Sequence, residues 1–258
     1  MEEPPVSDAV LRERQGRILV ITINRPEARN AVNLAVSQGL ADAVDELDSD
    51  PDLTVGVVTG AGGNFCSGMD LKAFAAGEAV AIPGRGIGFT ERPPRKPLIA
   101  AVEGYAVAGG TEVVLGTDLV VASTTARFGI PEVKRGLVAA GGGLLRLPHR
   151  IPYQKAFELA LTGETFTAEQ GEAWGFVNVL TEPGEALAGA LELAGRISAN
   201  GPLAVAATKD VLLQSADWSQ AEMWKKQMEL IIPVFSSNDA REGAVAFAEK
   251  RAPNWTGT

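Results

Sequence analysis

Short apolar runs alternate with helical patterns over the first half of the chain, and this alternation limits the fold more than any other feature. Segments 16–26, 54–63, 96–104 and 118–123 are rich in β-branched residues and are bounded by glycine or proline. The segment between the first two is helical, with Asn33 as its N-cap, and its apolar spacing is set by Leu34, Leu40, Val44 and Leu47. A second, short helix is predicted over 109–117. The alternation predicts an α/β domain with largely buried strands.

Beyond about residue 140 the pattern predicts helices alone. Apolar residues recur at helical spacing in six segments, 153–163, 168–175, 185–200, 202–214, 221–235 and 239–251. We therefore expect a helical tail on an α/β body. Segment 73–97 is rich in Gly and Pro and weakly periodic, which predicts a long mobile loop with one short helix at most; loops of this length are usually functional or disordered.

Charge and cysteine content exclude several classes of partner. The chain has 32 acidic against 23 basic residues, a net charge of −9, which argues against nucleic acid or an anionic membrane as the main partner. Its single cysteine cannot form an internal disulfide, as is typical of a reducing cytoplasm. The acidic, proline-rich stretch 1–10 does not have the pattern of a signal or transit peptide, and no apolar stretch approaches the ~20 residues of a membrane span.

Several familiar catalytic chemistries lack their residues. His149 and Cys66 are the whole supply of imidazole and thiol, too few for a zinc site, so no metal is expected. The G-x-S-x-G elbow of hydrolases is absent, and the glycines at 60–63 lack dinucleotide or Walker spacing. We interpret His149 as a helix-end or interface residue and Cys66 as a small core residue.

Two acids stand in unusual surroundings. Glu112 interrupts the apolar run 101–123, and Glu132 follows a proline at the end of a predicted strand. Two carboxyl groups in one apolar pocket push their pKa values apart and supply an acid and a base. The adjacent Gly109 and Gly110 can direct backbone N–H groups at a developing oxyanion. The alternative is equally simple: Glu112 is a first-turn helix acid and Glu132 an ordinary loop acid.

Five segments in order resemble the enoyl-CoA hydratase/isomerase (crotonase) superfamily. They are "ITINRPEARNAV", "GAGGNFCSGMDLK", "PLIAAVEGYAVAGGTEVVLGTDLVVAS", "ARFGIPEVKRGL" and "FAEKRAPNW". The resemblance implies an α/β fold with a crotonase-like β-β-α spiral core, expected over 1–195. It also implies a C-terminal helical region, expected over 196–258, that drives assembly into a homotrimer or a dimer of trimers.

The resemblance also assigns expected roles to residues. The oxyanion hole falls on the backbone N–H groups of Met69 and Gly109, and the two hydratase acids fall on Glu112 and Glu132. In relatives that hydrate, the acid in the second place transfers a proton at the α-carbon and the first activates the water. Ala108 replaces a glycine common in the motif, with an effect expected only on local pocket width.

The expected substrate is an acyl-CoA thioester, with no separate cofactor. Ala28 and Arg29 are expected near the nucleotide, Lys72 near phosphate, and Phe247 and Lys250 are expected to complete the CoA site of a neighbouring subunit. For Lys72 and Lys250 the alternative is a solvated surface lysine, and Asp70 has no expected catalytic part and is otherwise a loop acid or helix cap. The remaining residues expected to line the substrate site are Ser67, Gly68, Asp70, Leu71 and Gly110.

Three functions remain open. The leading one is reversible hydration of a 2-enoyl-CoA, a hydro-lyase activity, because both acids are present. The alternative is a double-bond isomerase that needs Glu132 alone, or a specialised hydratase such as a carnitinyl-CoA dehydratase. The third is a non-catalytic acyl-CoA-binding protein, which would be expected to lack one or both acids.

Overall fold

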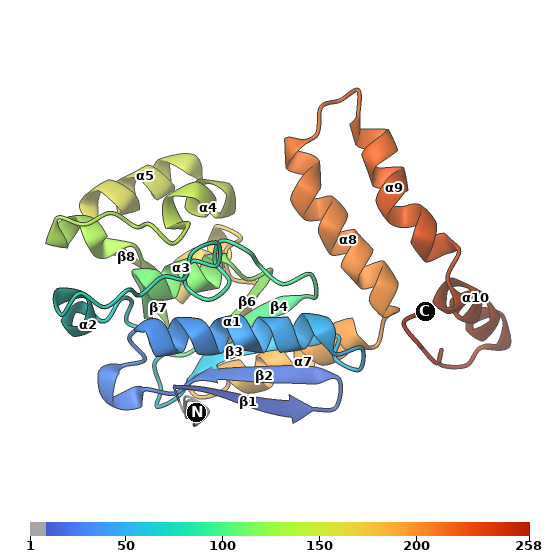
Figure 1. The fold of residues 1–258 in the computed structure, drawn as a ribbon, viewed down its shortest axis with the longest axis horizontal. Coiled ribbons are helices and arrows are strands. Elements are labelled where there is room, and N and C mark those ends of the chain that lie inside the picture. The colour runs from blue at the N-terminus through green and yellow to red at the C-terminus, as the bar shows by residue number, and fades with distance from the viewer. Residues whose placement is uncertain (1–8) are drawn as a thin grey trace, which may run out of the picture.

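A six-stranded sheet forms the centre of the computed structural model, which describes residues 9–258 (Figure 1). The interpretation of residues 1–10 as neither signal nor transit peptide lies almost wholly outside that range. The first strand pairs antiparallel with the second, and all other pairings in this sheet are parallel. In spatial order the strands are β1 (Val10–Gln15), β2 (Ile18–Ile23), β3 (Val55–Gly60), β4 (Leu98–Val102), β6 (Leu119–Ser123) and β9 (Val179–Thr181).

A second sheet has three short strands, β5 (Tyr105–Val107), β7 (Arg127–Gly129) and β8 (Thr165–Thr167). The strand predicted before Pro131 corresponds to β7, whereas the sequence prediction missed β5 and β8, and it also missed β1 and β9. The expectation of helices alone beyond residue 140 was therefore wrong, because β8 and β9 lie there. Strands of three residues are too short for an alternating pattern, and β1 buries only Val10, so its signal is that of a solvated segment.

Helices cover both faces of the larger sheet. Helix α1 (Leu34–Ser49) begins as predicted, since the Asn33 side chain accepts a hydrogen bond from the Val36 N–H at 3.1 Å. Its buried residues pack in the main core together with alternate residues of the strands, such as Val58 and Ala100. The other alternate residues, such as Val57 and Ile99, face α7 (Ala186–Ser198) in a separate core. This alternation is what a parallel sheet buried on both faces requires.

Helix α3 (Gly109–Leu115) is short, and all seven of its residues are buried. It follows β5 and is flanked by three other short elements that carry residues named above. These are η1 (Pro26–Ala28), α2 (Leu71–Ala75) and η2 (Pro131–Arg135).

Segment 76–97 contains no further helix or strand, so the expected loop with one short helix corresponds to α2 and the chain after it. The loop is tied to the body in its middle. Arg85 donates hydrogen bonds to the Gly88 carbonyl at 3.1 Å and to Asp45 at 2.9 Å, and Ile87 and Phe89 are buried. The loop therefore packs part of its length into the core.

Helices α8 (Pro202–Gln214), α9 (Met223–Phe235) and α10 (Asn238–Glu249) extend away from the sheets as a C-terminal arm (Figure 1). The other helices that follow η2 are α4 (Gly143–Arg150), α5 (Tyr153–Thr162), α6 (Ala168–Ala173) and α7, and the short η3 (Ser215–Asp217) lies after α8. The predicted boundary at 195/196 falls in the last turn of α7, and the division into two domains stays a prediction. Within residues 9–258 no helix has the length and apolar character to cross a bilayer.

Candidate active site

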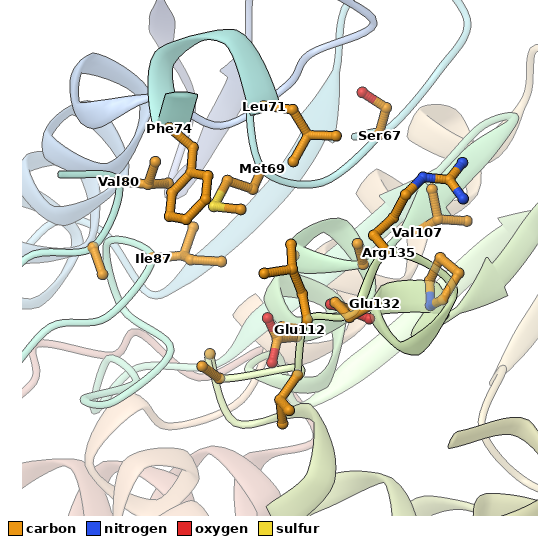
Figure 2. Close-up of a pocket in the computed structure, with 18 of the residues that line it drawn as sticks. Ser67, Met69, Leu71, Phe74, Val80, Ile87, Val107, Glu112, Glu132 and Arg135 are labelled. Atoms are coloured by element: carbon orange, nitrogen blue, oxygen red, sulfur yellow. The ribbon is translucent and has the colours of Figure 1, made fainter. Parts of the chain in front are cut away.

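A cavity of about 520 Å³ opens between α2, α3, η2 and the loop after α2 (Figure 2). Its walls are mostly apolar, from residues such as Phe74, Val80 and Ile87. Six of the residues expected in the site line it, and they are Ser67, Met69, Leu71, Gly109, Glu112 and Glu132.

Two backbone N–H groups meet at this cavity. Residues on either side of Met69 hydrogen-bond to Val32, since Val32 N–H donates to the Gly68 carbonyl and Asp70 N–H to the Val32 carbonyl, both at 2.8 Å. Gly109 begins α3, and a Cβ built on it would lie 3.7 Å from the Met69 nitrogen. Across residues 9–258 neither the Met69 nor the Gly109 N–H donates to a protein acceptor. Both are therefore available to a ligand oxygen.

The turn before α3 is strained. Ala108 has φ 53° and ψ −127°, a region that side chains rarely adopt. Its N–H donates to the Gly129 carbonyl at 2.8 Å and its carbonyl accepts from Glu112 N–H at 3.1 Å, so both ends of the residue are fixed. This conformation sets the direction of the next peptide N–H, that of Gly109.

Glu112 is 3% exposed and has backbone donors. The Gly143 N–H donates to its Oε1 at 2.9 Å. Burial raises the pKa of Glu112, while the N–H groups of Gly143 and Gly141 and the charge of Arg146 oppose that rise. Burial therefore raises the pKa overall, and the backbone donors and Arg146 limit the rise by stabilising the charged form.

Glu132 has its own backbone N–H as a donor, and that group lowers its pKa. Its Oε2 is the single buried side-chain nitrogen or oxygen without a hydrogen-bond partner in residues 9–258. Burial, and secondarily the charge of Glu112, raise the pKa of Glu132 to about 7. Figure 2 shows both glutamates in the same part of the cavity. Near neutral pH the pair therefore favours one charged carboxylate and one carboxylic acid.

The other residues expected near CoA lie on the neighbouring surface. Ser67 N–H donates to the Arg29 carbonyl at 3.0 Å, which places Ala28 and Arg29 beside the "CSGM" segment. Lys72 is exposed on α2 and does not line the cavity. Gly68 packs against the Ala108 Cβ and the Val107 carbonyl, and Gly110 packs against the Cys66 carbonyl, so that a side chain would not fit at either position.

Asp70 is occupied by structural contacts. Its carboxylate accepts from the N–H groups of Lys72 and Ala73, capping α2, and forms an ion pair with Arg25 at 3.1 Å. These contacts match the alternative interpretation as a helix cap.

Phe247 and Lys250 lie far from this cavity in the same chain. Both are exposed, Phe247 at 87%, and both belong to α10 or its C-cap. In Figure 1 α10 lies at the opposite end of the molecule from α2 and α3. One chain therefore does not bring them to the site, and a part for them requires a second chain.

Sequence reasoning missed the backbone donors to Glu112 and the cation near it. The donors come from the glycine run at 141–143, and the positive charge from Arg146. Three consecutive glycines just before a helical segment were the available signal. The interpretation of Cys66 as a small core residue is confirmed, since the residue is fully buried and this burial raises the pKa of its thiol to about 12.

Comparisons with known proteins identify the family. The enoyl-CoA hydratase/isomerase family profile matches residues 13–258. The enoyl-CoA hydratase EchA19 of Mycobacterium tuberculosis is 45% identical over 95% of both chains, and a carnitinyl-CoA dehydratase of Salmonella arizonae is 41% identical over 98% of this chain and all of its own.

A crystal structure of enoyl-CoA hydratase EchA1 from Mycobacterium marinum matches with a TM-score of 0.96 and 66% identity, covering 97% of this chain and 99% of that one. The predicted fold class, an α/β crotonase fold with C-terminal helices, is confirmed. Near-complete coverage in both directions leaves no part of the fold without a counterpart in these relatives. The chain belongs to the enoyl-CoA hydratase/isomerase family.

Proposed function

We propose that this protein is an enoyl-CoA hydratase, which adds water reversibly across the double bond of a 2-enoyl-CoA thioester. One observation carries the proposal: Glu112 with its backbone donors and Glu132 with its pKa raised to about 7 line the same cavity as two backbone N–H groups that have no acceptor within residues 9–258. Hydration needs a base for water, an acid for the α-carbon and donors for the thioester oxygen, and each has a candidate here.

Each group has one part in the reaction. The Met69 and Gly109 N–H groups donate to the thioester oxygen as it gains negative charge; loss of one such donor typically costs about 3 kcal/mol of barrier. Charged Glu112 takes a proton from water while the water oxygen bonds to the β-carbon. The electron pair of the double bond moves toward the thioester, and protonated Glu132 then gives its proton to the α-carbon.

The shape of the cavity supports an apolar acyl group. Ser67 lies at the end beside Ala28 and Arg29, where the CoA portion is expected. At the other end of Figure 2 lie Phe74, Val80 and Ile87, which offer no polar group to a substrate tail. We therefore expect 2-enoyl-CoA esters with hydrocarbon tails to be preferred over the polar acyl group of carnitinyl-CoA.

We also propose a homotrimer or a dimer of trimers, in which Phe247 and Lys250 of one chain complete the CoA site of the next. The support is their exposure and their distance from the cavity of their own chain. A cytoplasmic location is proposed as well, supported by the single, buried, unpaired cysteine.

Replacing the acids singly and together tests the proposed function. Glu112→Gln and Glu132→Gln should each lower kcat on crotonyl-CoA by roughly 10²- to 10⁴-fold with acyl-CoA affinity nearly kept, because glutamine preserves shape but cannot transfer the proton. The double variant should lose far less than the product of the two single losses, since the acids act on one water. Calorimetric Kd values beside the rates separate catalysis from binding.

The other functions give different results in the same experiment. An isomerase would lose activity with Glu132→Gln and tolerate Glu112→Gln, and its product would not gain the mass of water. A non-catalytic binder would show no hydration in the unmodified protein. Hydration that survives both substitutions at the wild-type rate would mean that these glutamates are not the catalytic pair.

A further inference from the structure

Arg146 on α4 is a partly buried cation with no part in the proposed reaction. Its Nη2 donates a hydrogen bond to the Thr90 carbonyl at 2.5 Å. Within residues 9–258 no carboxylate lies within ion-pairing distance of it, and the negative charge that acts on it is that of Glu112. A partly buried guanidinium without a direct ion pair is costly, so its presence here calls for a physical reason.

The first contact of Arg146 is with the segment that supports Glu112. Its Nη1 occupies the space that a side chain on Gly142 would take. Gly142 has φ 103°, which favours glycine, and its neighbours Gly141 and Gly143 are the residues whose N–H groups stabilise the Glu112 carboxylate. The guanidinium therefore packs directly on the backbone that orients Glu112.

The second contact of Arg146 is with the loop that forms the cavity wall. Thr90, whose carbonyl accepts from Arg146, uses its Oγ1 to accept from the Ile87 N–H at 3.0 Å. The Ile87 side chain packs over the oxyanion glycine, with its Cδ1 3.0 Å from where a Cβ on Gly109 would lie. The Arg146 side chain thus links the glycines that donate to Glu112 with the cavity wall beside the Gly109 N–H group.

We propose that Arg146 is a positioning residue of the hydration site: it holds the 141–143 backbone and the Thr90 turn together, and it places a positive charge that acts on the Glu112 carboxylate. The proposal rests on the proposed function. Arg146 touches neither substrate nor reacting atoms in it, and its effect passes through Glu112 and Ile87.

Arg150, one turn along α4, is the matched comparison: it too is partly buried and donates to a carbonyl, that of Thr117 at 3.0 Å, but its counter-charge is Asp118. The other acidic, basic and histidine side chains on the elements around Arg146 belong to α3, η2, α4, α5 and the loop after α2. They are Glu112 on α3, Glu132, Lys134 and Arg135 on η2, His149 on α4, Lys155 and Glu158 on α5, and Glu78, Arg85, Glu91, Arg92, Arg95 and Lys96 on the loop.

Two substitutions separate the charge of Arg146 from its hydrogen bond. Arg146→Gln keeps a donor for Thr90 and removes the charge, so the acid limb of kcat/KM against pH should move up by about one unit, as Glu112 protonates more readily. Arg146→Lys keeps the charge, so that limb should stay within about 0.3 unit. In both variants the 141–143 segment and the Thr90 turn should be displaced. This displacement should lower kcat by roughly 10- to 100-fold, with a smaller change in KM.

Arg150→Gln is the control for a general loss of stability. It should lower the melting temperature as Arg146→Gln does, without moving the acid limb. The proposal is overturned if Arg146→Gln leaves the limb where it is, or if Arg150→Gln moves it equally.

A direct titration keeps the test independent of activity. In protein labelled with ¹³C at the glutamate carboxyl carbon, the Glu112 resonance is assigned by its loss in Glu112→Gln. Its titration midpoint should rise by about one unit in Arg146→Gln and stay in Arg146→Lys. An unchanged midpoint overturns the proposal whatever the enzyme catalyses, whereas a shifted midpoint in a protein that hydrates no enoyl-CoA overturns the proposed function and leaves the charge coupling standing.

Discussion

At the scale of single residues, the two glutamates differ in what surrounds their oxygens. Glu112 accepts from backbone N–H groups, whereas Oε2 of Glu132 has no partner within residues 9–258. A carboxylate with backbone donors is stabilised in its charged form, and an isolated one is not. Two chemically identical side chains are thereby divided into a base and an acid by the backbone around them.

This division predicts the pH dependence of the reaction. In one turnover Glu132 gives up a proton and Glu112 gains one, so the pair holds a single proton before and after in either direction. The kcat/KM value should therefore fall as pH rises through about 7, where Glu132 loses that proton, and should fall again at acid pH as Glu112 is protonated. Initial rates of hydration and dehydration measured from pH 4.5 to 9 should give the same two limbs; a rate that rises steadily to pH 9 would contradict the assignment.

Ala108 gives a second prediction at this scale. Its backbone lies in a region that glycine occupies without strain, so Ala108→Gly should remove strain of about 1–3 kcal/mol, partly offset by the greater freedom of glycine in the unfolded chain. We expect a net gain of about 1 kcal/mol in the free energy of unfolding, measured in urea, with kcat within about threefold. Ala106→Gly, at the buried middle residue of strand β5 just before, is the control and should destabilise.

At the scale of elements, the C-terminal arm is attached to the sheets by a buried ion pair. Lys209 on α8 is 8% exposed, and its Nζ donates to Asp118 at 2.7 Å and to the Lys96 carbonyl at 3.0 Å. Asp118 also accepts from the Leu98 N–H at the start of β4. The arm is thus joined to the first residue of a central strand.

Breaking this pair should cost far more than breaking a surface pair. Lys209→Met leaves Asp118 partly buried without its cation, and we expect a loss of about 3 kcal/mol in the free energy of unfolding. Lys155→Met removes the exposed pair with Glu158 and should change it by less than about 0.5 kcal/mol. Chemical denaturation of both variants makes the comparison, and equal losses would show that α8 is not held by Lys209.

The elements that could be predicted from sequence are those whose signal is local. The spacing of Leu40, Val44 and Leu47 and the cap Asn33 determine α1 without reference to anything distant. Strands β5 and β8 have three residues each and exist because they pair with β7 across the fold, which no local pattern encodes.

The site follows the same rule. Glu112 stood out because an acid is rare among apolar neighbours, and Glu132 because it follows a proline at the end of a predicted strand; both line the cavity. Arg146 did not stand out, because a basic residue in a helix is ordinary until its burial and its contact with Gly142 are known. Residues that act on a site through backbone contacts cannot be recognised from the local sequence.

At the scale of the whole molecule, the arm exposes more apolar surface than a free chain normally carries. The large exposed residues of α9 recur at helical spacing and form one stripe, Trp224, Met228, Ile232 and Phe235. Trp224 and Phe235 are 72% and 76% exposed. Such a stripe is characteristic of an interface between subunits.

We predict that the protein is a trimer or hexamer at micromolar concentration. Changing Trp224 and Ile232 together to Asp should lower the mass measured by light scattering. It should also weaken acyl-CoA binding, because Phe247 and Lys250 of the neighbouring subunit would be lost from the CoA site. Exchanging two exposed charged residues of the same helix, Lys225 and Glu229, should leave both unchanged. A monomeric mass for the unmodified protein would rule out this assembly.

The complete burial of α3 has a consequence for how the enzyme loses activity on heating. No local fluctuation can expose the amides of Val113, Val114 and Leu115, since all seven residues of the helix lie in the core. In native-state hydrogen exchange these amides should be released only with global unfolding, whereas those of the exposed stretch 75–79 should exchange through small local openings. The helix that carries Glu112 and the Gly109 donor therefore keeps its shape until the whole domain melts, and warming should abolish activity and tertiary structure at the same temperature.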